Sequence, residues 1–280
     1  MKGARRLREL IRTGAPVVAP GAHDLLTTKL VAQHGFPAVY LGSYGCAASR
    51  YGLSDQSLVT MSELLDQARL MVEATDLPVI ADLEEGGGNA VSTYHNVRRF
   101  EAAGVAAMHI EDHAPGKLYG RGGTLHPIAS AAEKIRAALD ARRDPDTLII
   151  ARCEALVIGR SRAEATERCQ AYAEAGAEML LVTGLPLADT PTFAATIHRL
   201  MAAFVLDAPR DAVLASNIKI AIYPFQSVVV AYYALKGLLE ELNATGATAS
   251  FKDLRPAAKQ LEQLVGAETG SQLAQRYKVV

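Results

Sequence analysis

The sequence lacks the patterns that identify several classes of protein from their residues. It has 29 Lys and Arg against 30 Asp and Glu, a formal net charge of −1, and no run of basic residues. Nucleic-acid-binding proteins carry a basic patch or stripe, so we expect no nucleic-acid partner. The apolar runs fall short of the roughly 18 residues that a membrane span needs, and we therefore expect no membrane partner.

Cysteine is also scarce. The chain has three cysteines, Cys46, Cys153 and Cys169, without C-x-x-C spacing, which argues against a disulfide framework and against a thiolate zinc site. The first residues carry charges throughout and have no central apolar stretch, whereas a signal peptide requires one. We expect a cytoplasmic protein whose partner is a small molecule.

Half of the 280 residues are apolar, enough for one large core. Short apolar runs alternate with longer segments of helical period. The runs predict eight strands, at Val17–Ala19, Ala38–Leu41, Val79–Asp82, Ala106–Ile110, Leu148–Arg152, Met179–Val182, Met201–Val205 and Ile218–Tyr223. Helices are predicted at Leu25–His34, Met61–Ala74, Tyr94–Ala103, Ala131–Arg142, Arg162–Ala175, Thr192–Leu200 and Gln226–Asn243. Eight such units favour an α/β fold, a (β/α)₈ TIM barrel, over an open sheet.

The end of the chain has a different pattern. After Asn243 the sequence predicts helical segments, about 253–265 and 271–276, with no strand between them. We interpret residues 1–280 as a single barrel domain in which residues 244–280 form a helical oligomerisation extension.

Acidic residues lie at the ends of three of the predicted strands. Asp82 ends the third strand and is followed by Glu84, Glu111 comes directly after the fourth strand, and Glu154 comes two residues after the fifth. In a barrel of parallel strands these ends meet at one mouth, and alternation places Asp82 and Glu84 on the same side of an extended chain. Carboxylate oxygens suit a hard cation such as Mg²⁺, with Mn²⁺ as an alternative. We predict a metal site at Asp82, Glu84 and Glu111, the alternative being that the first two simply lie in a solvated loop.

Arg152 ends the fifth predicted strand beside this cluster. A fixed guanidinium there can hold a substrate carboxylate through two hydrogen bonds, although it can also serve only to balance the acids. Gly86, Gly87 and Gly88 invite comparison with a phosphate cradle, but the G-x-G-x-x-G and Walker spacings are not met.

Several motifs together resemble the isocitrate lyase and phosphoenolpyruvate mutase superfamily. They are Ala19-Pro20-Gly21-Ala22-His23-Asp24, Gly52-Leu53-Ser54-Asp55, the Asp82 segment, Ile110-Glu111-Asp112, Ile149-Ile150-Ala151-Arg152 and Ile222-Tyr223-Pro224. The resemblance implies a Mg²⁺-dependent (β/α)₈ barrel that acts on small 2-oxo or 2-hydroxy carboxylates. It also implies a homotetramer, or a dimer, with exchanged C-terminal helices.

The resemblance further implies roles for individual residues. Asp82, Glu84 and Glu111 match the metal-shell positions, with Asp55 close to them. The substrate-binding positions match Ser43, Tyr44, Gly45 and Arg152, the first three in a loop whose backbone holds a carboxylate. The lyase branch carries Lys-x-Cys-Gly-His on a gating loop, where this chain reads Lys117-Leu118-Tyr119-Gly120-Arg121. The presumed acid of the lyases is thus missing, and Tyr119, with an ordinary pKa of about 10, is a poor substitute. The catalytic candidates are Arg152, Tyr119, Lys117 and Glu111.

The Tyr-Gly-Arg form is more similar to the branch that contains oxaloacetate decarboxylase. The leading hypothesis is therefore a Mg²⁺-dependent carbon–carbon lyase that decarboxylates an oxaloacetate-like 2-oxo acid through a metal-stabilised enolate, since CO₂ leaves without a proton. The alternatives are cleavage of a 2-methylisocitrate- or malate-type acid, phosphonopyruvate chemistry, and a non-catalytic barrel that binds a small acid. Four departures from the family pattern leave these open: Glu84 replaces Asp, Gly87 replaces an aromatic residue, Thr183 replaces Glu, and Ala203 lies nearest the missing Asn of the seventh strand.

Overall fold

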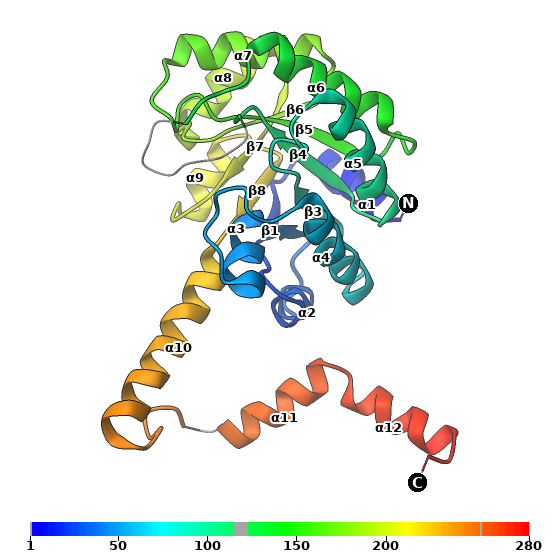
Figure 1. Cartoon of the computed structure of the whole chain (residues 1–280), viewed down its shortest axis with the longest axis vertical. Coiled ribbons are helices and arrows are strands. Elements are labelled where there is room, and N and C mark those ends of the chain that lie inside the picture. Colours follow the sequence, from blue (N-terminus) through cyan, green and yellow to red (C-terminus); the bar gives the residue numbers. More distant parts are fainter. Residues whose placement is uncertain (1, 115–122, 253, 280) are drawn as a thin grey trace. The chain divides into compact units, whose positions relative to one another are not determined.

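The computed structural model describes residues 2–114, 123–252 and 254–279, in two compact units, Met1–Gln226 and Ser227–Val280. The first unit contains eight parallel strands in the order β1-β8-β7-β6-β5-β4-β3-β2. The strands are β1 Val17–Pro20, β2 Val39–Leu41, β3 Val79–Asp82, β4 Ala107–Glu111, β5 Leu148–Cys153, β6 Met179–Val182, β7 Leu200–Phe204 and β8 Ile220–Tyr223. A parallel bridge between Gly21 and Tyr40 joins the two ends of this order. The predicted (β/α)₈ barrel is confirmed, with all eight strands at the predicted places (Figure 1).

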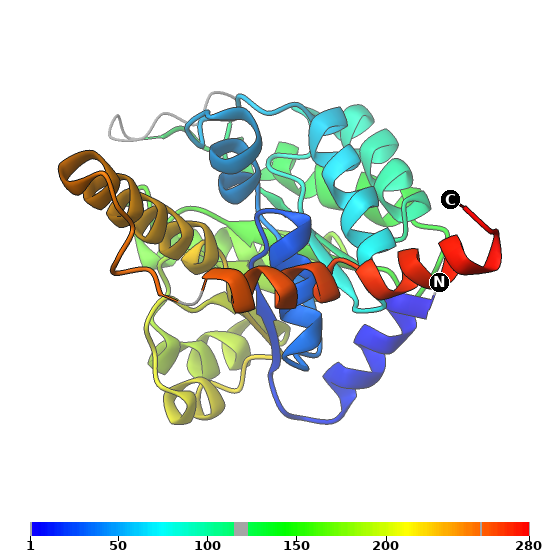
Figure 2. The same cartoon turned by 90° about the horizontal axis from the view of Figure 1, so that it is seen from below.

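Helices connect the strands and cover the outside of the barrel. In this unit they are α1 Lys2–Arg12, α2 Leu25–Gln33, α3 Ser43–Cys46, α4 Met61–Ala74, α5 Ala90–Ala102, α6 Ile128–Ala141, α7 Arg162–Glu174, α8 Thr190–Ile197 and α9 Arg210–Ala215. The predictions missed α1, α3 and α9. Helix α1, dark blue in Figure 2, leads through a loop into β1. This helix is highly charged, but it also has an apolar stripe, because Ala4, Leu7 and Ile11 are buried at helical spacing.

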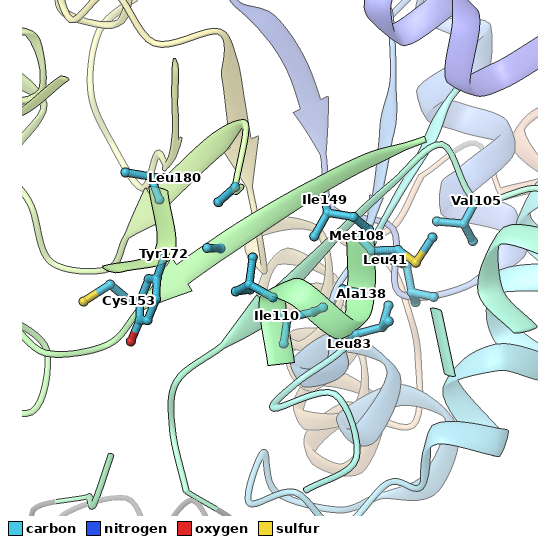
Figure 3. Packing of buried hydrophobic residues seen from close by; sticks show 14 of the residues in the cluster. Leu41, Leu83, Val105, Met108, Ile110, Ala138, Ile149, Cys153, Tyr172 and Leu180 are labelled. Atoms are coloured by element: carbon cyan, nitrogen blue, oxygen red, sulfur yellow. The ribbon is translucent and has the colours of Figure 1, made fainter. Parts of the chain in front are cut away.

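Two apolar layers hold the barrel together. Inside it, Ile80, Ile150 and Ile222 belong to a cluster that also takes in Leu7 of α1. Outside it, a second cluster packs the strands against the helices; Figure 3 shows Met108 and Ile149 of neighbouring strands within this layer. Because side chains alternate along a strand, every second residue points to each layer. Residues that follow the inner cluster by two positions on the same strand, such as Asp82 after Ile80, therefore point toward the mouth of the barrel.

Closure of the barrel brings two backbones together at Gly21. A Cβ atom at this position would lie 2.4 Å from the carbonyl oxygen of Pro224. The Gly21 amide donates to the carbonyl of Tyr223 at 2.8 Å, which extends the pairing of β1 with β8. Only a residue without a side chain permits this approach.

The second unit is helical, as predicted for residues 244–280. It continues α10 (Gln226–Thr245) into α11 (Leu254–Leu264) and α12 (Ala267–Arg276). None of the described residues of these helices is buried, and they expose large apolar side chains, including Val230, Tyr233, Leu235, Leu239 and Leu261. Throughout the described ranges, no helix combines the length and the apolar character that crossing a bilayer requires.

Candidate active site

A cavity of about 750 Å³ opens at the carboxyl ends of the strands. This is the end of a TIM barrel at which catalytic sites lie. Its lining includes five residues that the sequence analysis singled out, Ser43, Tyr44, Asp55, Asp82 and Arg152. Gly45, Glu84 and Glu111 do not line it, but all three are buried.

Asp82, the last residue of β3, is held by groups from several elements. Its Oδ1 accepts a hydrogen bond of 2.8 Å from the backbone amide of Glu84. Ser43 Oγ lies 3.1 Å from Asp82 Oδ2 and 3.2 Å from Asp55 Oδ1, so one hydroxyl proton serves two carboxylates. The hydroxyl of Tyr40 also lies near Asp82, at 3.4 Å. These contacts fix the orientation of the carboxylate before any ligand binds.

Tyr40 lies at the floor of the cavity. Burial, followed by the negative charge of Asp82, raises the pKa of its hydroxyl well above the ordinary value, so this group stays protonated. The hydroxyl also lies 3.0 Å from Nε2 of His109, and the two rings stack. Tyr40 is therefore a fixed donor beneath the acidic residues.

Arg152 stands opposite these acids, and the strand register explains why. Residues Glu111 and Arg152 are direct partners in the pairing of β4 with β5, so their side chains point to the same side. Arg152 Nη1 lies 3.0 Å from Glu111 Oε2 and 3.5 Å from Asp82 Oδ2, while Nε donates to Glu154 Oε1 at 2.5 Å. Burial alone would lower the pKa of Arg152, but Glu111, Glu154 and Asp82 raise it well above its ordinary value. The guanidinium is a permanent charge surrounded by three carboxylates.

The backbone beside these acids is held by a buried lysine. Lys134 of α6 is 2% exposed, and its Nζ donates to the carbonyl oxygens of Glu85 at 2.8 Å and Glu111 at 3.4 Å. Burial lowers the pKa of Lys134 to about 8, in spite of neighbouring acids that raise it. Glu84, which precedes Glu85, adopts a left-handed backbone with φ of 47°, a strained conformation for a residue with a side chain. The lysine therefore ties the loop after β3 to the end of β4.

Asp112 points away from the mouth, because side chains alternate along an extended chain. Its Oδ2 accepts from the hydroxyl of Tyr172 at 2.6 Å and lies 3.3 Å from Arg168 Nη1, and its Oδ1 accepts from the backbone amide of Glu154 at 2.8 Å. Burial raises the pKa of Asp112, and these three donors oppose that shift. The residue fastens the end of β5 to α7 from outside the barrel.

Two of the predicted catalytic residues are not among those that the structure describes. Lys117 and Tyr119 lie outside the described residues. Sequence reasoning counted Glu154 among the acids at the mouth but did not pair it with Arg152, and it gave no role to Phe204. Glu154 follows Arg152 by two residues and thus shares its side of the strand, which is a signal that alternation carries. The ring of Phe204 lies 4.9 Å from the Arg152 guanidinium carbon. No signal in the sequence marks this contact, because an apolar residue at the end of a strand does not stand out from the core.

The buried carboxylates have the chemistry that Mg²⁺ needs. Asp82, Glu84 and Glu111 are each at most 3% exposed and offer only oxygen ligands. Within the described ranges, no three His, Cys, Asp or Glu side chains form a ready-made ligand set. Mg²⁺ is usually held by one or two carboxylates and keeps several waters, so a sparse acidic set of this kind fits it.

The fold is a TIM barrel with buried acidic residues where its strands end, the end at which such barrels carry their catalytic sites. The family model described as phosphoenolpyruvate phosphomutase matches residues 7–243. The chain belongs to this family, within the superfamily that its motifs resemble.

Comparison with similar proteins narrows the range of reaction types to be considered. The chain is 36% identical over 286 residues to 2,3-dimethylmalate lyase of Eubacterium barkeri, which covers 99% of each chain. It is 38% identical over 179 residues to an oxaloacetate decarboxylase of Rhodopseudomonas palustris, but this match covers 62% of the chain and 61% of the relative. A solved structure of phosphonopyruvate hydrolase with oxalate and Mg²⁺ is similar at a TM-score of 0.88, with 29% identity over 99% of both chains. The chain thus stands among carbon–carbon lyases and related enzymes.

Proposed function

We propose that this protein is a Mg²⁺-dependent carbon–carbon lyase that acts on a small 2-oxo or 2-hydroxy carboxylate. The observation that carries the proposal is the pairing of Arg152 with Glu111 and Asp82 at the end of the cavity. Decarboxylation of a 2-oxo acid leaves negative charge on the 2-oxygen, whereas cleavage of a 2-hydroxy acid starts from a negatively charged 2-oxygen, which becomes a carbonyl as the charge moves to the departing carbanion. A site for either reaction needs positive charge on one side and fixed donors on the other.

The described residues divide these tasks. Asp82, Glu84 and Glu111 would hold Mg²⁺, and the ion would supply Lewis-acid polarisation of the 2-oxygen. Arg152 would bind a substrate carboxylate, since its planar fork suits that group. Ser43 and Tyr40 keep Asp82 in place through contacts of 3.1 and 3.4 Å. Two comparisons support this division of tasks: the similarity to a lyase over 99% of the chain, and the similarity to a structure that holds oxalate and Mg²⁺.

Two reactions fall within the proposal. Cleavage of a 2-hydroxy diacid of the malate type is favoured by the similarity to 2,3-dimethylmalate lyase over 99% of the chain. Decarboxylation of an oxaloacetate-like 2-oxo acid is favoured by the shorter match to oxaloacetate decarboxylase, and it needs no acid to release CO₂. A malate-type cleavage needs a donor for the carbanion, and Tyr119, a residue outside the described ranges, is our candidate.

Metal binding and turnover test the proposal together. Purified protein with Mg²⁺ should release a 2-oxo acid from malate-type diacids, or CO₂ from oxaloacetate, faster than Mg²⁺ alone does. Asp82→Asn should abolish both the binding of Mn²⁺ seen by calorimetry and this rate, because it removes a ligand charge and keeps the shape. The matched control Asp66→Asn, at an exposed side chain on α4, should change neither. Equal Mn²⁺ binding by wild type and Asp82→Asn would refute the proposed site.

We also propose that the second unit assembles the protein into a homotetramer or dimer by exchange of C-terminal helices, in the cytoplasm. Leu235, Leu239 and Leu242 are each at least 45% exposed on α10, and exposed apolar rows of this kind mark interaction surfaces. Light scattering should show a multimer, and Leu235→Lys with Leu239→Lys should reduce its mass. A wild-type monomer at micromolar concentration would rule out the assembly.

A further inference from the structure

The two sides of the cavity differ in chemistry. On the side of β2 to β5 the lining is polar, with Ser43, Asp55, Asp82 and Arg152. On the side of β6 to β8 the lining residues after the strands are mainly apolar: Leu185, Pro186, Leu187, Phe204, Val205, Leu206, Ala208, Pro224 and Phe225. Val157, from the loop after β5, adds to the apolar side. A ligand that spans the mouth therefore meets a charged wall at one end and an apolar wall at the other.

The apolar wall offers no positive charge to a second carboxylate. Arg152 is the one basic side chain among the described lining residues, and Glu111, Glu154 and Asp82 already surround it. The charged residue on the far side is Asp207, which is acidic. An anionic group placed there would lose its hydration and meet a like charge.

The cavity also exceeds the needs of a short acid. Its volume of about 750 Å³ lies within the range, roughly 300–1,000 Å³, of pockets that enclose drug-sized ligands. Malate or oxaloacetate bound at Asp82 and Arg152 would leave the apolar wall in contact with water. An alkyl group would remove that water from apolar surface and gain free energy in proportion to its area.

We infer that the apolar wall, formed by Val157, Leu187 and Leu206, binds an alkyl chain of the substrate. The substrate is then a 2-oxo or 2-hydroxy acid that carries an alkyl substituent of several carbons beside the bond that breaks. This inference rests on the proposed function for the charged end of the cavity. It adds the chemical class of the remainder of the molecule.

A series of uncleavable 2-oxo acids distinguishes binding at the charged end of the cavity from binding at the apolar wall. Calorimetry with Mg²⁺ present would compare pyruvate, 2-oxobutanoate, 2-oxopentanoate and 2-oxohexanoate, whose heads are identical. Affinity should rise about fourfold for each methylene, which is the factor for a fully buried CH₂ group, and on the order of fiftyfold across the series. Equal affinity for pyruvate and 2-oxohexanoate would overturn the inference while leaving the charged site intact.

Variants locate the chain-binding surface. Leu206→Asn and Val157→Asn replace side chains that are 56% and 55% exposed, so the fold should tolerate both changes. Each should flatten the dependence on chain length and leave the affinity for pyruvate unchanged. Leu214→Asn is the matched control, because Leu214 on α9 is 47% exposed and does not line the cavity. Full chain-length dependence in both Leu206→Asn and Val157→Asn would contradict the assignment.

Turnover distinguishes failure of the inference from failure of the proposed function. Malates substituted with methyl, propyl or butyl groups should be cleaved with kcat/KM values that increase with the length of the group. Efficient cleavage of unsubstituted malate or oxaloacetate, with no gain from substitution, refutes the alkyl site but supports the lyase. If no compound is cleaved and no 2-oxo acid binds with Mg²⁺, the proposed function itself fails.

Discussion

The hydroxyl of Tyr172 donates a 2.6 Å hydrogen bond to Asp112, one residue beyond the end of β4. Both side chains are buried, and the other oxygen of Asp112 accepts from the backbone amide of Glu154. Hydrogen bonds therefore connect α7 through Asp112 to the residue that follows β5, the strand that carries Arg152. Arg152 is therefore linked to α7 outside the barrel as well as to the acids at its mouth.

We predict that Tyr172→Phe destabilises the protein by about 1–3 kcal/mol, because a buried carboxylate loses a donor. Tyr172 opposes the rise in the pKa of Asp112 that burial causes, so the variant should raise that pKa further. Urea unfolding at neutral pH measures the loss. Tyr51→Phe, at a half-buried tyrosine, serves as the control and should lie within about 0.5 kcal/mol of wild type. Equal stability of Tyr172→Phe and Tyr51→Phe would show that the hydrogen bond from Tyr172 to Asp112 contributes no net free energy to folding.

We predict that Arg152→Met costs about 3–5 kcal/mol of folding free energy, because it leaves Glu111, Glu154 and Asp82 buried without their counter-charge. Arg152→Lys keeps the charge and should recover much of the stability, but it loses the planar fork that pairs with carboxylates. Denaturation curves compare stability, and oxalate binding with Mg²⁺ compares function. Wild-type oxalate affinity in Arg152→Lys would argue against a substrate role for the guanidinium.

A pH-dependent contribution is predicted at the opposite end of the barrel. Glu178 pairs with Arg8 of α1 and with Arg142, each at 2.6 Å. Burial alone would raise the pKa of Glu178, but the bonds from the two arginines outweigh it, and the pKa lies below its ordinary value. The stabilisation is therefore present above the unfolded-state pKa of about 4.3 and is lost as the pH falls through the lower pKa of the folded state.

The test is Glu178→Gln, followed by urea unfolding from pH 7 to pH 3. The variant should be less stable than wild type at pH 7, by at most about 1 kcal/mol because the side chain is 35% exposed. The difference should shrink as the pH falls below 4. Glu133→Gln, at an exposed pair with Arg136, should show almost no difference at any pH. A difference for Glu178→Gln that grows on acidification would reverse the sign and refute the prediction.

Closure of the barrel gives a fourth prediction. Gly21→Ala should destabilise the protein by about 1–3 kcal/mol, because the new methyl group would overlap the carbonyl of Pro224 and push β1 away from β8. Gly3→Ala is the control: its Cβ would meet only Ala106 and its neighbours at 3.7 Å or more, and alanine favours helix α1. Thermal unfolding compares the two variants. A Gly21→Ala protein as stable as Gly3→Ala would mean that the strands shift without cost.

The strands were predictable because each is a short apolar run ended by polar or turn residues. Even the seventh, expected at 201–205, is present at Leu200–Phe204. Helices α3 and α9 were missed because they are short, with four and six residues, and carry little periodicity. Helix α1 was missed because its four arginines give the segment a charged composition, although its buried positions repeat at helical spacing.

The site was predictable in part for a similar reason. Asp82, Glu111 and Arg152 end neighbouring strands, and the carboxyl ends of parallel strands meet at one mouth. One feature lay beyond the sequence: Tyr172 reaches Asp112 across 60 positions of the chain. No pattern within a segment encodes a contact of that kind.

The sequence by itself determined the alternation of strand and helix, the family, and which acids end which strands, because these depend on periodicity and on residues within one segment. Only the tertiary structure decided how those acids share one guanidinium, and that one side of the cavity is charged while the other is apolar. Such relationships depend on strand register and on helices packed from distant parts of the chain, and those are fixed only when the barrel closes.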